Sequence, residues 1–374
     1  MKSLTIISHT EHYLTADGMV VGLSATVTEI NSLLAVFDSI IHVAMLHHTP
    51  PPIGAIPYIS NRVTFVALPA VGGPKFRDKL TILKQLPKIL ALVNNSVRQT
   101  DCFQFRAPTG IGVFVIPYLI WGSSKKGWFK YAGNWKQTQA PWSYRFQKWL
   151  LKQQSRRVTM NGYWQNEPKH CIPFENPCLT EADIKKGAVT AVEKSNSDLL
   201  HFCFVGRLEA AKGLNLLLET VRGLNDTMRN KIAAIHVVGT GAGLEVYKQF
   251  AVKWALPVVF HGFLERNAVH DIYRQCHAII LPSASEGFPK VIAEAMNFGC
   301  IPIVSNVSAI GHYIENNKNG FLIRNLDVPG VTASLHQFMT LNAQNYKRIR
   351  ICARQDIYKF SYAYYNRRIQ QEIL

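Results

Sequence analysis

The sequence has little of what marks secreted and membrane-spanning proteins. Its seven cysteines form no C-x-x-C pair, and an odd number without close pairing fits a reducing cytoplasm better than a disulfide framework. The N-terminal stretch MKSLTIISHT holds too few apolar residues for the core of a signal peptide. The longest apolar run, 111–121, is about half a membrane span and contains Pro117. These absences predict a cytoplasmic protein, free in solution or lying peripherally on the inner face of a membrane.

Patterns that hold metal ions are also missing. There is no Asp-x-Asp pair, which removes one common way of holding a divalent cation. Cys171 and Cys178 beside His170 could act as metal ligands, but their spacing is not a recognised zinc pattern, and ordinary packing explains them as well. We therefore predict no metal and no other cofactor.

Acidic residues are absent between Cys102 and Asn166, where six of the seven tryptophans lie. Residues 142–157 place Trp142, Phe146, Trp149 and Leu150 on one face of a predicted helix. Such a helix suits an anionic membrane surface, but a helix that packs on the core of its own domain has the same pattern. An anionic polysaccharide would also use this charge, whereas no nucleic-acid module accompanies it, so we predict no nucleic-acid partner. The stretch contains these cations: Arg106, Lys125, Lys126, Lys130, Lys136, Arg145, Lys148, Lys152, Arg156 and Arg157.

Short apolar strands alternate with helical patterns along the whole chain, which predicts an α/β protein with parallel, doubly wound sheets. A chain of 374 residues fits two domains. The predicted strands are 3–8, 40–46, 62–68, 102–107, 157–162, 201–206, 233–239, 258–263, 278–282 and 300–305. The predicted helices are 24–37, 77–97, 211–224, 243–255, 266–275 and 289–298.

The stretch 174–198 combines prolines with a polar run, so we place the domain boundary there. The first domain is predicted to span 1–175 and the second 176–355. The aromatic segment 356–374 could dock back onto the first domain as a final helix.

The most informative segment is 281–305, where a strand leads into Glu286-Gly287-Phe288-Pro289 and a helix that carries Glu294. Pro289 suits the first helical position, and the N–H groups near Lys290 and Val291 then face whatever lies above the helix. A helix N-terminus favours anions such as phosphate, and Gly287 permits close approach. Ionised carboxylates accept hydrogen bonds from hydroxyls. Together these features predict a site for a sugar nucleotide.

Two motifs now identify a family resemblance. Glu286 and Glu294, eight positions apart, match the E-x7-E signature of the large retaining GT-B glycosyltransferase family usually numbered four, also called group 1. Residues 206–213, GRLEAAKG, match its G-R-L-x-x-x-K-G motif, and VVGTGAG at 237–243 and FHGFL at 260–264 are typical of the same domain. The resemblance implies a GT-B fold, in which two Rossmann-like domains face each other across a cleft.

The resemblance also implies roles for particular residues. Arg207 and Lys212 would clamp the donor diphosphate in place of a metal, and Glu286 would bind hydroxyls of the donor sugar. Glu294 would hold the nucleotide ribose. Gly239 could approach the diphosphate or simply form a tight turn. We thus predict Arg207, Lys212 and Glu286 as catalytic. The predicted donor-binding residues are Gly206, Gly239, Gly287, Phe288, Lys290, Val291 and Glu294.

The first domain departs from the family pattern. Relatives often carry a Gly-Gly pair after the first strand, where this chain has TEHYLTADGMVVG with Gly18. Arg106 stands where many relatives place a histidine near the reacting sugar. We take Gly18 and Arg106 as the candidate acceptor-side residues. Four histidines are also open as contacts, although a lone histidine is more often structural. These are His9, His12, His47 and His48.

The sequence therefore predicts a metal-independent, retaining hexosyltransferase. Its donor would be a nucleoside-diphosphate sugar and its acceptor a glycan or lipid-linked sugar in surface polysaccharide biosynthesis. Two alternatives remain at this point: a sugar-nucleotide epimerase or hydrolase of the same fold, and a non-catalytic relative that binds a membrane or polyanion.

Overall fold

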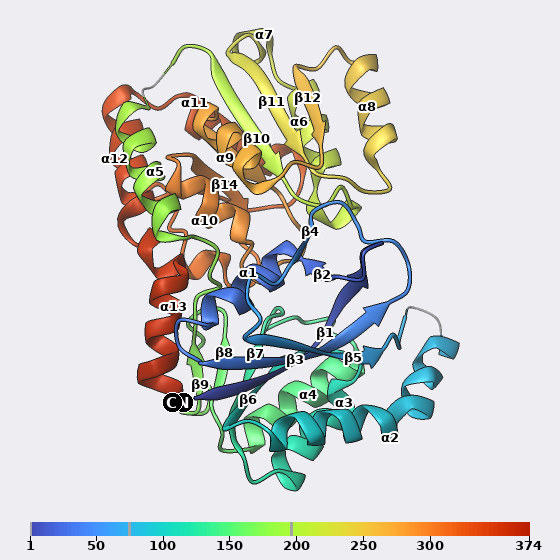
Figure 1. Cartoon of the computed structure of the whole chain (residues 1–374). Coiled ribbons are helices and arrows are strands. Elements are labelled where there is room, and N and C mark those ends of the chain that lie inside the picture. The colour runs from blue at the N-terminus through green and yellow to red at the C-terminus, as the bar shows by residue number, and fades with distance from the viewer. Residues whose placement is uncertain (1, 74–75, 195–196) are drawn as a thin grey trace. The chain divides into compact units, whose positions relative to one another are not determined.

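The computed structural model describes residues 2–73, 76–194 and 197–374. Ser195 and Asn196, at the end of the predicted boundary stretch, lie outside the described residues. The chain divides into two compact units (Figure 1). The first comprises Met1–Glu175 and Tyr362–Leu374, and the second Asn176–Ser361.

The sheet of the first unit is built around a parallel series in the order β5-β3-β1-β6-β7-β8-β9. Strands β2 and β4 extend it antiparallel beside β1. The central strands are apolar on both faces, as expected for a sheet covered by helices. The bounds are β1 Ser3–Leu14, β2 Val20–Leu23, β3 Ser39–His47, β4 Ala55–Pro57, β5 Val63–Pro69, β6 Cys102–Ala107, β7 Lys126–Tyr131, β8 Val158–Met160 and β9 Cys171–Pro173.

Helices cover both faces of this sheet (Figure 1). Side chains of α2, α3 and α4 form one apolar core with the sheet. Side chains of α1, α13 and η5 form a second core on the other face. The bounds are α1 Ser24–Leu33, α2 Phe76–Arg98, α3 Gly112–Pro117, η1 Tyr118–Gly122, α4 Trp142–Gln153, α13 Tyr362–Arg368 and η5 Ile369–Ile373.

The loop that we expected after the first strand is instead a β-hairpin. Strand β1 continues to Leu14 because its second half pairs with β3 beyond a bulge between Ile7 and Glu11, and β2 returns beside it. Gly18 has φ +80 in the turn and its N–H donates to Thr15 O at 3.0 Å. A glycine at this position therefore allows the hairpin turn, which requires a positive φ.

The sheet of the second unit is parallel throughout and has the order β12-β11-β10-β13-β14-β15. Its strands are β10 Leu200–Val205, β11 Ile232–Val238, β12 Val258–Gly262, β13 Ala278–Leu281, β14 Ile301–Ser305 and β15 Phe321–Ile323. Its helices are α5 Glu181–Glu193, η2 Ala210–Lys212, α6 Leu214–Arg222, α7 Asp226–Arg229, α8 Leu244–Lys253, α9 Arg266–Gln275, α10 Lys290–Asn297, η3 Ile310–His312, α11 Val328–Met339, α12 Ala343–Gln355 and η4 Ile357–Phe360.

The boundary stretch differs from its expected irregular form, because α5 occupies much of it. Thr180 caps this helix: its side chain accepts from the Asp183 N–H, and the Asp183 side chain accepts from the Thr180 N–H. This reciprocal capping box supplies partners for N–H groups that the first turn of a helix leaves open. The polar composition that resembles a linker is thus the solvent-facing side of a capped helix.

Candidate functional site

The candidate site lies where the strand order of the second sheet reverses. Strands β10 and β13 are neighbours, and successive strands continue outward from them in opposite directions. In open α/β sheets, ligands bind at the carboxyl ends of the strands at such a switch point. The loops that follow Val205 and Leu281 both emerge there.

Hydrogen bonds hold these two loops together. The N–H of Ala284 donates to Ala211 O at 2.8 Å. Gly213 has φ +78, and a Cβ at this position would lie 2.1 Å from Pro282 O. Glycine is therefore required at 213 for both its conformation and its close contact. The packing fixes the relative positions of the side chains on the two loops.

Lys212 and Glu286 meet across this junction. Nζ of Lys212 lies 2.6 Å from Oε1 of Glu286, and the carboxylate is almost fully buried. Lys212 ends the short helix η2 rather than starting the long one, because Gly213 turns the chain before α6 begins. The two residues that the motifs single out, 74 positions apart, thus form one charged pair.

Arg207 takes a different position from the one predicted for a clamp. Its side chain is 76% exposed and pairs with Glu209 at 3.1 Å. The neighbouring Leu208 is buried and its N–H donates to Thr240 O. Arg207 is therefore a surface cation near the carboxyl ends of the strands. Lys212, by contrast, forms the ion pair with Glu286.

The N-terminal end of α10 begins one residue later than predicted. Pro289 is the N-cap, with φ −70 and ψ 124, and the helix starts at Lys290. The N–H of Ile292 donates to Pro289 O at 3.1 Å, so Val291 lies in the first turn. The carbonyl of Gly287 accepts from the Ala309 N–H at 3.4 Å. The N-terminal end of the helix follows directly on the loop that carries Glu286, as the sequence requires.

Phe288, predicted to contact the donor, is a buried core residue. Its ring packs against Tyr313 and Phe360, with centroid distances of 4.7 and 4.9 Å. These aromatic contacts hold the Phe288 side chain in the core, so Phe288 fixes the position of the loop that carries Glu286 and Gly287.

Glu294 has partners that the sequence did not indicate. Arg266 donates from Nη1 to Oε1 of Glu294 at 3.2 Å and from Nη2 to Asp183 at 2.8 Å. Burial raises the pKa of Glu294, while Arg266 opposes that effect. Hydrogen bonds from Thr180 and Arg266 lower the pKa of Asp183 against the effect of its own burial. Arg266 therefore links Glu294, the second glutamate of the motif, to α5, the first helix of this unit.

Gly239 approaches the backbone of Gly206 at the ends of β11 and β10. It has φ +133, and a Cβ there would lie 1.9 Å from Gly206 O. The structure shows a close approach between the backbones of Gly239 and Gly206, and the predicted approach of Gly239 to the donor stays a prediction.

Replacing Gly239 with alanine should destabilise the second unit by about 3 kcal/mol or more, because the added Cβ combines backbone strain with a clash. Gly262→Ala is the matched control: its φ is +67, but nothing lies within 4 Å of a Cβ there. The control should cost only about 1 kcal/mol. Denaturant unfolding followed through Trp254 measures both variants, and equal losses would contradict the assignment.

In the first unit, the predicted acceptor-side Arg106 is turned into the protein. It lies on β6, is buried, and donates to Gln104 at 3.0 Å and to Glu29 at 3.0 Å. Lys130 of β7 contacts the same carboxylate oxygen at 2.5 Å. Arg106 is therefore a structural ion-pair residue, and the prediction that it faces an acceptor is wrong for this conformation. Gly18 serves the hairpin turn described above.

The four histidines left as possible ligand contacts in the sequence analysis differ in burial. His12 is buried, its Nε2 lies 2.9 Å from the Tyr58 hydroxyl, and burial lowers its pKa to about 4. His9 is partly buried and burial lowers its pKa as well. His47 and His48 lie beside a hollow of 470 Å³ at the carboxyl end of β3. Of these two, His48 is exposed, whereas His47 is partly buried together with its Nε2.

The contacts of His170, Cys171 and Cys178 do not support the alternative in which they bind a metal ion. Nε2 of His170 lies 2.9 Å from Leu151 O, Cys171 packs into the core of the first unit, and Cys178 contacts Lys290 O in the second. Across residues 2–73, 76–194 and 197–374, no three His, Cys, Asp or Glu side chains group as metal ligands.

Residues Trp142–Gln153 of the basic aromatic segment form α4. The residues predicted to share one apolar face of this helix differ in burial. Leu150 is buried in the core, whereas Trp142 and Trp149 are exposed. Two of the tryptophans earlier in the stretch, Trp128 and Trp135, are fully buried. Within the described part of the chain, no helix is long and apolar enough to cross a membrane.

Comparison with known proteins supports the sequence resemblance. Residues 188–356 match the family Glycosyl transferases group 1. An uncharacterized glycosyltransferase of Methanocaldococcus jannaschii is 27% identical over 122 residues, which cover 32% of this chain and 30% of that protein. The lipopolysaccharide 1,6-galactosyltransferase of Escherichia coli is 25% identical over 170 residues, covering 44% and 46%. The matches to these two curated relatives thus span less than half of each relative's length.

Solved structures share the fold over nearly the whole chain. HepE of Anabaena in complex with UDP and glucose aligns with a TM-score of 0.70 at 15% identity, covering 99% of this chain and 98% of that one. Sucrose-phosphate synthase of Thermosynechococcus elongatus aligns with a TM-score of 0.74 at 14% identity, covering 99% and 98%. The predicted α/β class, GT-B with two Rossmann-like domains, is confirmed.

Proposed function

We propose that the chain, whose residues 188–356 match the group 1 glycosyl transferases, is a retaining hexosyltransferase. The donor is a nucleoside-diphosphate hexose. The acceptor is a glycan or a lipid-linked sugar of polysaccharide or lipopolysaccharide biosynthesis. The reaction uses side-chain cations in place of a metal ion.

The contact between Lys212 and Glu286 carries this proposal. A cation and a carboxylate from the two strands that flank the switch point lie 2.6 Å apart, beside the N-terminal end of α10. The cation and the helix end favour the anionic diphosphate, and the carboxylate favours sugar hydroxyls. A diphosphate sugar presents both groups on adjacent parts of one molecule.

In the proposed reaction, the bond between the anomeric carbon and the β-phosphate oxygen breaks as the acceptor oxygen bonds to the same face of that carbon. The acceptor proton passes to the departing phosphate oxygen. Lys212 stabilises the charge that develops on this phosphate, and the exposed Arg207 adds a second cation from the mouth of the site. Glu286 accepts hydrogen bonds from the hexose, while Glu294 holds the ribose with the carboxylate that Arg266 orients.

Relatives support the choice of donor and pathway. HepE, whose fold is similar, has been seen with UDP and glucose. The Escherichia coli relative is named as a lipopolysaccharide galactosyltransferase, and another from Salmonella typhimurium as a colanic acid biosynthesis glycosyltransferase. Of these two names, the first specifies the transfer of a hexose, galactose.

A thermal-shift screen across UDP-, GDP-, ADP- and dTDP-hexoses tests the proposal. A cognate donor at a hundredfold excess over its Kd should stabilise the protein by about 2.7 kcal/mol. Transfer to acceptor, measured with the same donor, should be unchanged by a chelator such as EDTA. Loss of activity in EDTA contradicts the metal-free reaction. Conversion of donor without acceptor indicates an epimerase or hydrolase, and no stabilisation by any donor indicates a non-catalytic relative.

A further inference from the structure

An exposed row of aromatic rings runs along α4. Trp142 and Phe146 stack with centroids 5.4 Å apart and an interplanar angle of 6°, and Phe146 and Trp149 lie 6.1 Å apart at 25°. Trp142 is 69% exposed and Trp149 is 55% exposed. Residues spaced by four and three positions share one side of a helix, so the rings form a continuous ridge. We call these three residues the α4 ridge.

The two tryptophans of the ridge are exposed, whereas Phe146 packs partly against the core of the first unit. A different side of α4 anchors the helix, where Gln147, Leu150 and Leu151 are buried. The Gln147 side chain donates to Thr109 O at 2.8 Å and accepts from the Thr109 N–H at 3.1 Å. Because this side and Phe146 already anchor the helix, the exposed indoles of Trp142 and Trp149 are apolar surface in excess of what folding requires.

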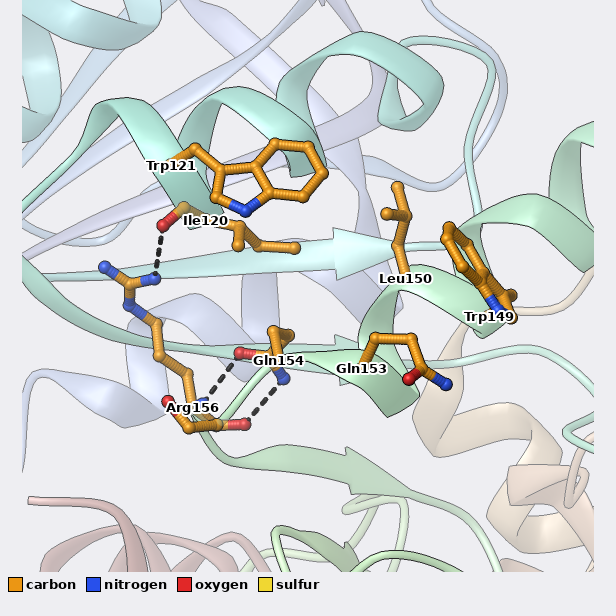
Figure 2. Close-up of a pocket in the computed structure, with 8 residues that line it drawn as sticks. Ile120, Trp121, Trp149, Leu150, Gln153, Gln154 and Arg156 are labelled. Atoms are coloured by element: carbon orange, nitrogen blue, oxygen red, sulfur yellow. Dashed lines mark hydrogen bonds between the residues drawn. The ribbon is translucent and has the colours of Figure 1, made fainter.

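A further tryptophan faces the ridge from a neighbouring segment. Trp121 of η1 is 73% exposed, and a hollow of 460 Å³ separates it from Trp149. Figure 2 shows the two indoles on either side, with Ile120 and Leu150 between them. Arg156 fixes this geometry by donating to Ile120 O at 3.2 Å, and to a second carbonyl of the same loop at 2.7 Å. Two separate elements thus present large aromatic side chains around one apolar hollow.

The charge around this surface has one sign. Between Cys102 and Asn166 the sequence has ten Lys or Arg and no Asp or Glu. Arg145, Lys148 and Lys152 follow one another at helical spacing, so they form a cationic row beside the ridge on α4. The nearest acid along the chain, Glu167, is buried and pairs with Lys136 and Lys152. An anionic partner would therefore meet the cations of Arg145 and Lys148, while the charge of Lys152 is already paired with Glu167.

We propose that Trp121, the α4 ridge and its cationic row form a docking surface for an anionic lipid bilayer. Indole rings favour the boundary between headgroups and acyl chains, and flanking cations attract anionic lipids. The hollow offers apolar surface to an acyl chain between the two indoles, at Ile120 and Leu150, while the polar residues Gln153 and Ser155 also line it. The Gln154 amide at its rim is already used within its own loop, with Leu151 O and Arg156 O. A glycan groove would instead need convergent free polar groups.

Vesicle flotation tests the surface without any glycosyl donor, so its result is independent of the proposed reaction. The protein should bind vesicles of phosphatidylcholine mixed with phosphatidylglycerol, and bind weakly to phosphatidylcholine alone. The double variant Trp121→Ala/Trp149→Ala should lower the partition coefficient at least about tenfold. Arg145→Gln should lower it roughly fivefold, the equivalent of one cation near an anionic surface.

Trp254→Ala is the matched control. This tryptophan is 41% exposed and also lies beside two cations, Arg222 and Lys253, but it belongs to the second unit and has no aromatic ridge. Its loss should leave vesicle binding unchanged, and the melting temperature should show that each variant is folded. Equal binding by the double variant and the wild type overturns the proposal. So does absence of vesicle binding together with Trp121-dependent binding to an anionic polysaccharide, which assigns the surface to a glycan.

Discussion

Replacing Lys212 with alanine should lower kcat by about 10²–10³-fold with a smaller effect on KM, the loss typical of removing one group that stabilises transition-state charge. The effect is concentrated in kcat because the negative charge on the β-phosphate oxygen grows only as the anomeric bond breaks. The variant should also be less stable than the wild type, because the almost fully buried carboxylate of Glu286 would lose its cationic partner. Steady-state kinetics of transfer, with the melting temperature of the variant, measure both effects.

Lys248→Ala provides the comparison, because Lys248 also pairs with a glutamate, Glu245, at 2.9 Å but lies exposed on α8. Its kcat should equal that of the wild type. Glu286→Gln should lower kcat as well, since the neutral amide is a weaker acceptor for the sugar hydroxyls. If Lys212→Ala turned over at the wild-type rate, the cation would have no part in the departure of the phosphate. An intact kcat in Glu286→Gln would remove the sugar contact assigned to the carboxylate.

Replacing Glu29 with glutamine should lower the free energy of unfolding of the first unit by about 3–5 kcal/mol. Its buried carboxylate lies 3.0 Å from Arg106 and 2.5 Å from Lys130, so the substitution leaves both cations facing a neutral amide inside the protein. Taking charges out of water is costly, and here Glu29 offsets that cost. Denaturant unfolding followed by tryptophan fluorescence reports this unit, because six of the seven tryptophans lie within residues 121–164.

The control for this prediction is Glu315→Gln. Glu315 contacts Lys318 at 2.9 Å, but both side chains are exposed, so its loss should cost no more than about 1 kcal/mol. A Glu29 variant as stable as this control would show that the buried cluster is not held by its carboxylate. Transfer activity need not be measured, so the prediction is independent of the proposed reaction.

The second unit was the easier half to predict from its sequence. Its strands are short apolar runs ended by glycine or proline, and the helices between them have clear periodicity, so β10, β11 and β13 start and end within about two residues of their predicted bounds. The encounter of Lys212 with Glu286 followed from family motifs. The sheet order could not be read locally, because it depends on which strands pair. The partnership of Glu294 with Arg266 depends on that order too.

The first unit shows why the remaining predictions failed. Strand β7 was missed because Lys126 and Lys130 made it resemble a solvated basic segment, although Lys130 is neutralised by a residue 101 positions away. Arg106 was placed near the acceptor because it stands where many relatives have a histidine, and the sequence does not show the distant Glu29 with which it pairs. On α4, helical spacing alone did not separate the buried Leu150 from the exposed Trp149. Each error concerns a side chain whose surroundings are set by long-range packing.

The two ends of the chain contribute to one core. Tyr365 and Ile369 complete the apolar cluster of the first unit, and the Asn366 side chain donates to Ser32 O at 2.8 Å. During synthesis, the first unit therefore leaves the ribosome first but lacks these residues until Tyr362–Leu374 have been translated. The second unit, Asn176–Ser361, is contiguous and can fold in the meantime. The unit whose synthesis begins first is thus completed after the second, and a chain truncated before Tyr362 would expose part of this core while retaining a complete second unit.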